Sequence, residues 1–237
     1  TLVNATAGTT VLGVFDPLEA IADVAQKHNV WLHVDAAWGG TLLLHKKLRT
    51  LLAGCERADS FTWDAHKMMG VPLVASAILM KRPGLLEKHF SEQAGYLFQS
   101  DEEEDEYDLG RASIQCGRRN DALKIWVAWQ VMGDKGYFKR ISKQRRLADY
   151  AARRIAADDR FELLMKPESL NVCFRLKGAD SRAICKRLDE TGQAKIGYGA
   201  FRGEDWLRLV TVNPDLKQDD IDRLLEAVAE RDETARR

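Results

Sequence analysis

The stretch that decides the fold is Trp31-Leu32-His33-Val34-Asp35-Ala36-Ala37-Trp38-Gly39-Gly40. Its first half predicts a short buried strand over residues 30–34, which delivers the carboxylate of Asp35 at its C-terminal end. In open α/β sheets, ligands bind just beyond the carboxyl ends of the strands. Asp35 is therefore a candidate ligand contact, because a partly buried carboxylate needs a positive or protonated partner. The alternative is that Asp35 only caps the helix that follows.

The sequence on both sides of this stretch alternates between short apolar runs and amphipathic segments. The run Asp16-Pro17-Leu18-Glu19 predicts a helix start, with Asp at the N-cap and Pro at the first helical position. Helical spacing is also present over residues 41–52. Further strands are expected over residues 2–5, 60–63 and 74–80. Such alternation is typical of an α/β fold with a mainly parallel sheet that helices cover.

A second stretch with chemical content is Trp63-Asp64-Ala65-His66-Lys67-Met68-Met69-Gly70, which ends another predicted strand. The neighbours of Lys67 along the chain are two methionines and a histidine. Apolar surroundings favour the neutral amine of a lysine, and the neutral amine can form a Schiff base with an aldehyde. The alternative is an ordinary exposed lysine in a loop.

Together, Asp35 and Lys67 suit one cofactor, pyridoxal 5'-phosphate, which needs a lysine for its aldehyde and an acidic group for its ring nitrogen. The carboxylate keeps the pyridine ring protonated, and the protonated ring accepts electrons when a bond at Cα of an amino acid breaks. The small residues next to Asp35 allow the backbone to lie close to the ring. The two stretches therefore indicate a pyridoxal-phosphate site.

The pattern changes in the second half of the chain. Residues 101–108 contain seven acidic residues among eight, and such a run repels itself and stays solvated. The pattern after it is helical, with Gly133 and Gly136 between two helices. Strands are then expected over residues 161–164, 171–176 and 206–212, and helices over residues 181–191 and 219–229. We therefore expect a large domain over residues 1–134 and a small C-terminal α+β domain over residues 135–237.

Composition argues against several classes of function. The chain has 237 residues with 36 Lys and Arg against 36 Asp and Glu, so its formal net charge is zero. Nucleic acid and anionic membrane surfaces demand a clustered positive excess, so neither is expected as the main partner. No apolar stretch is long enough to span a membrane, and no signal-peptide pattern is visible. The spacing of the four cysteines and five histidines suits neither a zinc site nor a disulfide framework, which predicts reduced thiols, no metal and a cytoplasmic protein.

Three motifs carry a family resemblance: Asn4-Ala5-Thr6-Ala7-Gly8-Thr9-Thr10, His33-Val34-Asp35-Ala36-Ala37-Trp38-Gly39-Gly40 and Asp64-Ala65-His66-Lys67-Met68-Met69-Gly70. In combination and spacing they resemble the group II pyridoxal-phosphate amino-acid decarboxylases, which include glutamate, cysteine sulfinate, aspartate, aromatic-amino-acid and histidine decarboxylases. The similarity covers essentially the whole chain. It implies the fold type I architecture of pyridoxal-phosphate enzymes, with the second half of the large, mainly parallel-sheet domain followed by the small α+β domain.

The resemblance implies a role for each matching residue. Lys67 matches the Schiff-base lysine, and Asp35 matches the partner of the pyridine nitrogen. Ala37 matches the alanine whose methyl group packs on one face of the ring. Thr10 matches a hydroxyl near the ring oxygen of the cofactor, and His66 matches a histidine near its phosphate.

Asp64 stands where many members of the family carry an asparagine. It is kept among the candidates for cofactor binding, although a carboxyl group can donate a hydrogen bond to phosphate only when it is protonated. A direct phosphate contact is therefore questionable at this position.

Two further segments resemble the branch of the family that acts on acidic substrates. In Ala94-Gly95-Tyr96-Leu97-Phe98-Gln99, Tyr96 matches the tyrosine of a mobile catalytic loop that returns a proton to Cα as a general acid. The alternative is that Tyr96 only packs. The acidic run over residues 101–108 suits either a lid that closes over substrate or a solvated linker.

The other segment is Leu207-Arg208-Leu209-Val210-Thr211-Val212-Asn213-Pro214. A lone arginine in an apolar strand is costly to bury without an anion, and its guanidinium binds a carboxylate in a two-pronged way. Arg208 matches the arginine that holds the α-carboxylate of the substrate. The alternative is an internal salt bridge.

The resemblance implies a carboxy-lyase that decarboxylates an acidic L-amino acid to the amine and carbon dioxide. Glutamate, cysteine sulfinate and aspartate remain open as substrates. It also implies a homodimer in which the catalytic loop reaches the neighbouring site. The alternatives are transamination or aldol cleavage, or an inactive fragment that cannot hold the cofactor. Because members of the family are longer and the chain starts at Thr1 without Met, we expect a segment without the ring-stacking histidine and most of the phosphate cup.

Overall fold

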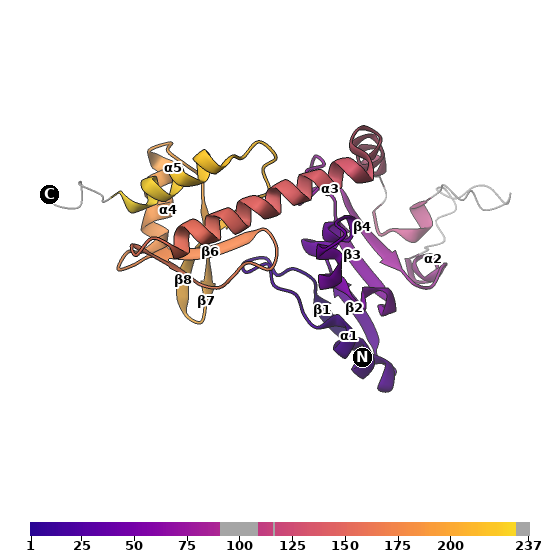
Figure 1. Ribbon diagram of the computed structural model, residues 1–237. Coiled ribbons are helices and arrows are strands. Elements are labelled where there is room, and N and C mark those ends of the chain that lie inside the picture. Colours follow the sequence, from indigo (N-terminus) through magenta and orange to yellow (C-terminus); the bar gives the residue numbers. More distant parts are fainter. Residues whose placement is uncertain (91–108, 116, 231–237) are drawn as a thin grey trace.

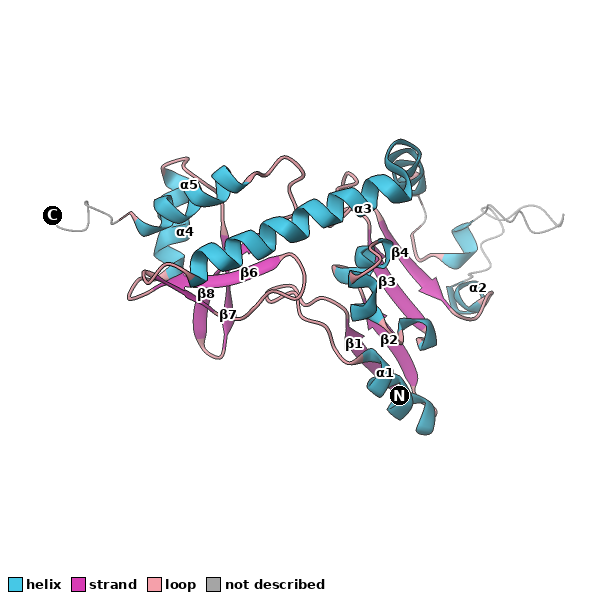
Figure 2. Cartoon of the chain, in the orientation of Figure 1, coloured by secondary structure: helices cyan, strands magenta, loops and turns pink. Residues whose placement is uncertain are grey.

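The computed structural model describes residues 1–90, 109–115 and 117–230, apart from the side chains of Leu109 and Arg111. Within these ranges the chain forms two four-stranded sheets, and one long helix runs past both of them (Figure 1). Figure 2 shows that most helices of the second half lie together on one side of the second sheet. No helix in the described ranges has the length and apolar character that crossing a membrane demands.

The first sheet has the strand order β1-β2-β3-β4, in which the first three strands are parallel and the fourth is antiparallel to the third. Its strands are β1 (Leu2–Thr6), β2 (Trp31–Asp35), β3 (Ser60–Asp64) and β4 (Ser76–Met80). The prediction of a mainly parallel sheet is confirmed. The register sets Thr6 opposite Asp35, and Asp35 opposite Thr62. The carboxyl ends of three strands therefore meet at one edge of the sheet.

One face of this sheet packs on a core, and the other carries polar side chains. Leu32 and Val34 of β2 are buried with Leu18 and Ala22 of α1 (Leu18–Lys27), whose apolar residues recur at helical spacing. Because side chains alternate between faces along a strand, Asp35 lies on the face opposite to Val34.

Helix α1 begins one residue later than the sequence predicts. Pro17 is the N-cap, and its carbonyl accepts a hydrogen bond from the Ile21 N–H at 3.0 Å. Asp16 does not cap the helix, because its carboxylate accepts from the Thr6 N–H at 2.7 Å. The aspartate thus fixes the end of β1 instead.

The helix predicted over residues 41–52 is wrong, because the structure has 3₁₀ segments there, η1 (Gly39–Leu44) and η2 (Leu48–Leu52), followed by η3 (Cys55–Arg57). His45 interrupts the helix with an extended backbone. Its ring Nδ1 accepts from the Leu48 N–H at 3.1 Å and so competes with a helical carbonyl for that amide.

The second sheet is wholly antiparallel, with the order β5-β6-β8-β7. Its strands are β5 (Phe161–Leu163), β6 (Asn171–Leu176), β7 (Gly197–Phe201) and β8 (Glu204–Val210), and α4 (Ser181–Glu190) and α5 (Gln218–Ala229) accompany it. Strand β7 was not predicted, because its two glycines leave no alternation of apolar and polar residues. Two short segments complete the described chain, α2 (Leu85–Phe90) and η4 (Leu109–Ala112).

The long helix α3 (Asp121–Ala156) joins the two halves. Gly133 has φ 58° and ψ 176°, so two helices meet at this glycine, as the sequence predicts. Tyr137 and Ile141 belong to the cores beside the first sheet, while Leu147 belongs to the core of the second sheet. The division at residues 134 and 135 stays a prediction.

Candidate active site

Asp35 ends β2 and is half-buried. One carboxylate oxygen, Oδ1, accepts a hydrogen bond from the Ala37 N–H at 3.1 Å, which closes a tight turn after the strand. The 3₁₀ segment that follows has no side-chain cap, so Asp35 is not a helix cap. The other oxygen, Oδ2, has no hydrogen bond to any residue that the structure describes, and it is available to a ligand.

Close packing brings the loops after β1 and β2 together. The Gly39 N–H donates to the Ala7 carbonyl at 2.9 Å, and the Ala7 N–H donates to the Asp35 carbonyl at 2.8 Å. A Cβ added at Gly8 would lie 2.8 Å from Cδ1 of Trp38, which leaves no space for a larger residue. The small residues after Asp35 therefore allow the two loops to approach each other closely.

Lys67 lies in the turn between β3 and β4, at the same edge of the sheet. Its Nζ is 2.9 Å from Oδ2 of Asp64, and 39% of its side chain is exposed. Met68 and Met69 are buried in two different cores and do not surround the amine. The expectation of an apolar environment for Lys67 is thus wrong within the described residues, because the methionines point away from it.

Asp64 is the ionic partner of this lysine. Burial opposes the ionisation of Asp64, but hydrogen bonds from Lys67 and Ser76 outweigh burial and hold the pKa of the carboxyl below its ordinary value. An ionised carboxylate only accepts hydrogen bonds, so Asp64 is unsuited to donate to a phosphate.

The backbone just before β4 holds the ring of His66 in place. Its Nδ1 lies 3.2 Å from the Ala75 nitrogen and 3.1 Å from the Ala75 carbonyl oxygen, and its Nε2 lies 3.8 Å from the Asp64 carboxylate. The ring is therefore held with Nε2 toward the edge where Lys67 and Asp64 lie.

Behind these residues, the polar face of the first sheet forms a hydrogen-bonded ladder. Ser60 Oγ accepts from Nε1 of Trp31 at 2.9 Å and lies 2.8 Å from Nδ1 of His33. Nε2 of His33 lies 3.2 Å from the hydroxyl of Thr62, the residue opposite Asp35. This ladder was not predicted, although the polar residues that alternate with apolar ones in β2 and β3 were a usable signal.

Thr10 lies in the loop after β1, with an exposed side chain. The hydroxyl of Thr9 is used inside the loop, where it accepts from the Val14 N–H at 3.3 Å. The loop crosses to the second sheet, as the indigo segment beside β6 and β7 shows (Figure 1). Thr10 thus stands where the two sheets approach each other.

Arg208 is on β8, directly opposite Cys173 of β6. Burial lowers the pKa of its guanidinium, and its Nε is buried with no hydrogen-bond partner among the described residues. It forms no ion pair with a described carboxylate, so the alternative of an internal salt bridge is not supported there. Arg175 is different, because its guanidinium forms ion pairs with the carboxylates of Glu162 and Glu204, at N–O distances of 2.8 and 2.9 Å.

The residues present suit pyridoxal phosphate. An amine and a carboxylate with one free oxygen lie at the carboxyl edge of a parallel sheet, and a guanidinium with an orphaned buried nitrogen lies on the sheet that the Thr10 loop reaches. Tyr96 and the acidic run over residues 101–108 lie outside the described residues.

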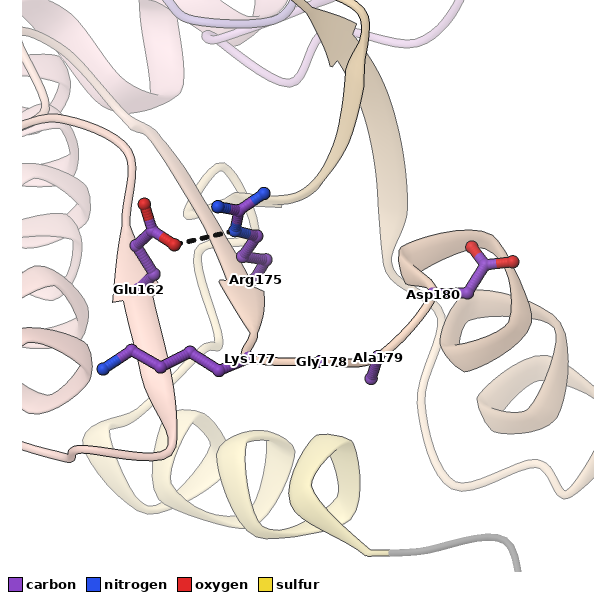
Figure 3. Close-up of a pocket in the computed structure, with 6 residues that line it drawn as sticks. All are labelled: Glu162, Arg175, Lys177, Gly178, Ala179 and Asp180. Atoms are coloured by element: carbon purple, nitrogen blue, oxygen red, sulfur yellow. Dashed lines mark hydrogen bonds and ion pairs between the residues drawn. The ribbon is translucent and has the colours of Figure 1, made fainter.

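The pocket in Figure 3 lies elsewhere, on the second sheet, and has a volume of about 470 Å³. Its lining residues are Glu162, Arg175, Lys177, Gly178, Ala179 and Asp180. The ion pair between Arg175 and Glu162 is drawn across one side of it. None of the expected site residues lines this pocket.

Known proteins share both sequence and structure with the chain. An acidic amino acid decarboxylase GADL1 from Homo sapiens is 40% identical over 247 residues, which cover 96% of this chain and 47% of the relative. A cysteine sulfinic acid decarboxylase from Mus musculus is 43% identical over 244 residues, which cover 94% of this chain and 50% of the relative. The crystal structure of mouse CSAD in its apo form has a TM-score of 0.88 at 40% identity, with 96% of this chain and 51% of that chain covered.

The chain spans about half the length of the curated relatives it matches. The structural match confirms the fold type I architecture that the motifs imply. The family profile described as the pyridoxal-dependent decarboxylase conserved domain matches residues 1–177, and pyridoxal phosphate is the cofactor of that family. The chain therefore belongs to the pyridoxal-dependent decarboxylase family.

Proposed function

We propose that the chain supplies part of the active site of an enzyme that decarboxylates an acidic L-amino acid to the amine and carbon dioxide. The observation that carries the proposal is the amine of Lys67 and the free carboxylate oxygen of Asp35 at one carboxyl edge of a parallel sheet. When bound, pyridoxal phosphate supplies an electron sink for the bond at Cα that breaks.

Five residues would hold this cofactor. Lys67 would bond to its aldehyde, and Asp35 would accept the proton of the ring nitrogen in a hydrogen bond. Ala37 would pack on the ring, and Thr10 would approach the ring oxygen. His66 would donate from Nε2 to the phosphate, because Nδ1 is engaged by the backbone of Ala75.

Asp64 takes a different role from the asparagine of many family members. As an ionised acceptor 2.9 Å from Nζ, it would hold and orient the Lys67 amine and leave the phosphate to His66. Asp64 would thus occupy the position of the family's asparagine but contact the lysine instead of the phosphate.

Arg208 would bind the α-carboxylate of the substrate, because its buried Nε lacks a partner and a carboxylate satisfies a guanidinium with two parallel hydrogen bonds. The relatives named as acidic amino acid and cysteine sulfinic acid decarboxylases support an acidic side chain in the substrate. Glutamate, aspartate and cysteine sulfinate are the candidates, with Tyr96 as the acid that protonates Cα.

The test is a cofactor titration followed by product analysis. The purified protein should develop the visible absorbance band of lysine-bound cofactor, and Lys67→Ala should abolish it. Lys81→Ala, at an exposed lysine, is the matched control and should keep the band. With each candidate substrate, release of carbon dioxide supports the proposal. Carbonyl products without carbon dioxide would instead identify a transaminase or an aldol-cleaving enzyme.

We also propose a cytoplasmic homodimer. The described cysteines Cys55, Cys173 and Cys185 are free thiols, which supports a reducing compartment. An exposed apolar stripe on the first half of α3 supports an interface, and it consists of Leu123, Trp126, Val127 and Val131. Light scattering of the purified protein should give twice the mass of one chain, and Trp126→Asp should reduce it.

A further inference from the structure

Two buried side chains at the start of β6 and just before it bind the loop after β1 to the second sheet. Nδ2 of Asn171 donates to two successive carbonyls, that of Thr10 at 3.1 Å and that of Val11 at 2.9 Å. Ser169 Oγ donates to the Gly13 carbonyl at 2.9 Å. Both side chains come from residues that are fully or almost fully buried. These bonds span more than 150 positions of sequence, so they set the distance between the two halves at this point.

Steric fit holds the same loop from both sides. A Cβ at Gly13, which has φ +69°, would lie 2.5 Å from Ser169 Oγ and 2.9 Å from Cγ of Asn171. A Cβ at Gly199 of β7 would lie 2.6 Å from Cγ1 of Val11. The loop therefore lies so close to β6 and β7 that only glycine fits at these two positions.

The same surface carries the substrate arginine. Residues directly opposite each other in an antiparallel pair share a face, so Cys173 and Arg208 lie on one face of the sheet. Cys173 is two residues after Asn171, and its Sγ donates to the Val11 carbonyl at 3.3 Å. The Val11 carbonyl is thus bound by the neighbour of Arg208 and by Asn171 at once.

We propose that Asn171 is a positioning residue that sets the Thr10–Val11 backbone against the face of the sheet that carries Arg208. It thereby fixes the hydroxyl that approaches the cofactor relative to the arginine that holds the substrate. The inference rests on the proposed function, because it takes Thr10 and Arg208 as cofactor and substrate contacts. The terminal amide suits the task, since it offers two N–H donors to two carbonyl oxygens.

Two substitutions at Asn171 test the proposal. Asn171→Ala removes both donors, and Asn171→Asp keeps the shape but sets a carboxylate against two carbonyl oxygens. The matched control is Ser181→Ala, because Ser181 is also buried and donates one hydrogen bond to a backbone carbonyl, that of Asp205 at 2.9 Å. Ser181 touches neither the loop nor Arg208 in any of its hydrogen bonds.

Three readouts separate positioning from general stability. In the cofactor-free protein, hydrogen exchange of the Gly8, Gly13 and Val14 amides, which are bonded within the loop, should accelerate about tenfold in both Asn171 variants. The cofactor dissociation constant should rise about tenfold, and substrate KM should rise more than kcat falls. Ser181→Ala should lower the thermal midpoint and leave these three quantities unchanged. Should Asn171→Ala not fold, Asn171→Ser, which keeps one donor, takes its place.

The outcomes are distinguishable. Cofactor binding in both Asn171 variants within about twofold of the parent overturns the positioning role, whatever their thermal midpoints. A parent protein that holds lysine-bound cofactor but releases no carbon dioxide from any candidate substrate refutes the proposed function, while hydrogen exchange in the cofactor-free protein still tests whether Asn171 anchors the loop. Equal changes of the dissociation constant in Ser181→Ala and in the Asn171 variants would show that the effect is general destabilisation.

Discussion

Replacing Arg208 by methionine should make the protein more stable and less active at the same time. The Nε of Arg208 is buried without a hydrogen-bond partner among the described residues, and burial lowers the pKa of the guanidinium. A buried polar group without a partner costs about 1–3 kcal/mol. Because the side chain is only half-buried, we expect Arg208→Met to raise the free energy of unfolding by about 1–2 kcal/mol. In a chain of this size that corresponds to roughly 2–8 °C in the thermal midpoint.

The catalytic effect should have the opposite sign. Loss of hydrogen bonds between a guanidinium and a carboxylate costs about 1.5–3 kcal/mol, so kcat/KM should fall by about one to two powers of ten. Urea unfolding monitored by tryptophan fluorescence measures the first effect, and initial rates of carbon dioxide release measure the second.

Arg175→Met is the control, because Arg175 lies in the same sheet but has two carboxylate partners and stacks on Trp206 at 4.5 Å. It should lower stability and leave kcat/KM unchanged. If Arg208→Met lowered the free energy of unfolding, Arg208 would have a structural partner, and its buried Nε would not be a cost to stability.

Three further changes test other parts of the structure. Asp64→Asn should lower stability at about pH 7, because a carboxyl with a lowered pKa stabilises the fold above its ordinary pKa. The difference from the parent should shrink as pH falls below the ordinary carboxyl pKa toward the lowered one, and urea midpoints over a series of decreasing pH values measure it. Gly13→Ala should lower the thermal midpoint by several degrees because of its positive φ and the contact with Ser169, while Gly178→Ala, also at positive φ but in open space, should cost less. Ser60→Ala should lower the free energy of unfolding in urea by about 1–3 kcal/mol, because it leaves the indole N–H of Trp31 without its acceptor. A decrease below about 0.5 kcal/mol would show that water replaces Ser60 as the acceptor.

Much of the fold could be predicted from the sequence, because hydrophobic period and turn chemistry are local. The strand over residues 171–176 and the helix junction at Gly133 are confirmed. The predictions are wrong where a side chain forms a hydrogen bond that the local pattern does not indicate. Asp16 is a good N-cap by sequence, yet it binds the Thr6 amide ten residues away. His45 breaks a helix that apolar spacing alone predicts.

The candidate site likewise contains residues that the local sequence indicates and residues that only tertiary contacts reveal. Asp35 and Lys67 could be proposed from the sequence because strand ends and the neighbouring small residues mark them. The orientation of the methionines beside Lys67 was not, since the sequence places residues next to the lysine without saying which way they point. Asn171 was missed for a related reason, because its partners are carbonyl groups more than 150 residues away, and no residue type marks them.

The long helix α3 has a consequence for how the protein unfolds. Tyr137 and Ile141 belong to cores on the side of the first sheet, and Leu147, Ala151 and Ile155 belong to the core of the second. The part of α3 after Gly133 contributes side chains to all of these cores. If this part unfolds, it exposes the cores beside both sheets, so unfolding of one half destabilises the other. The two halves should therefore melt in one cooperative transition, and a cut within this helix should release neither half as an independently folding unit.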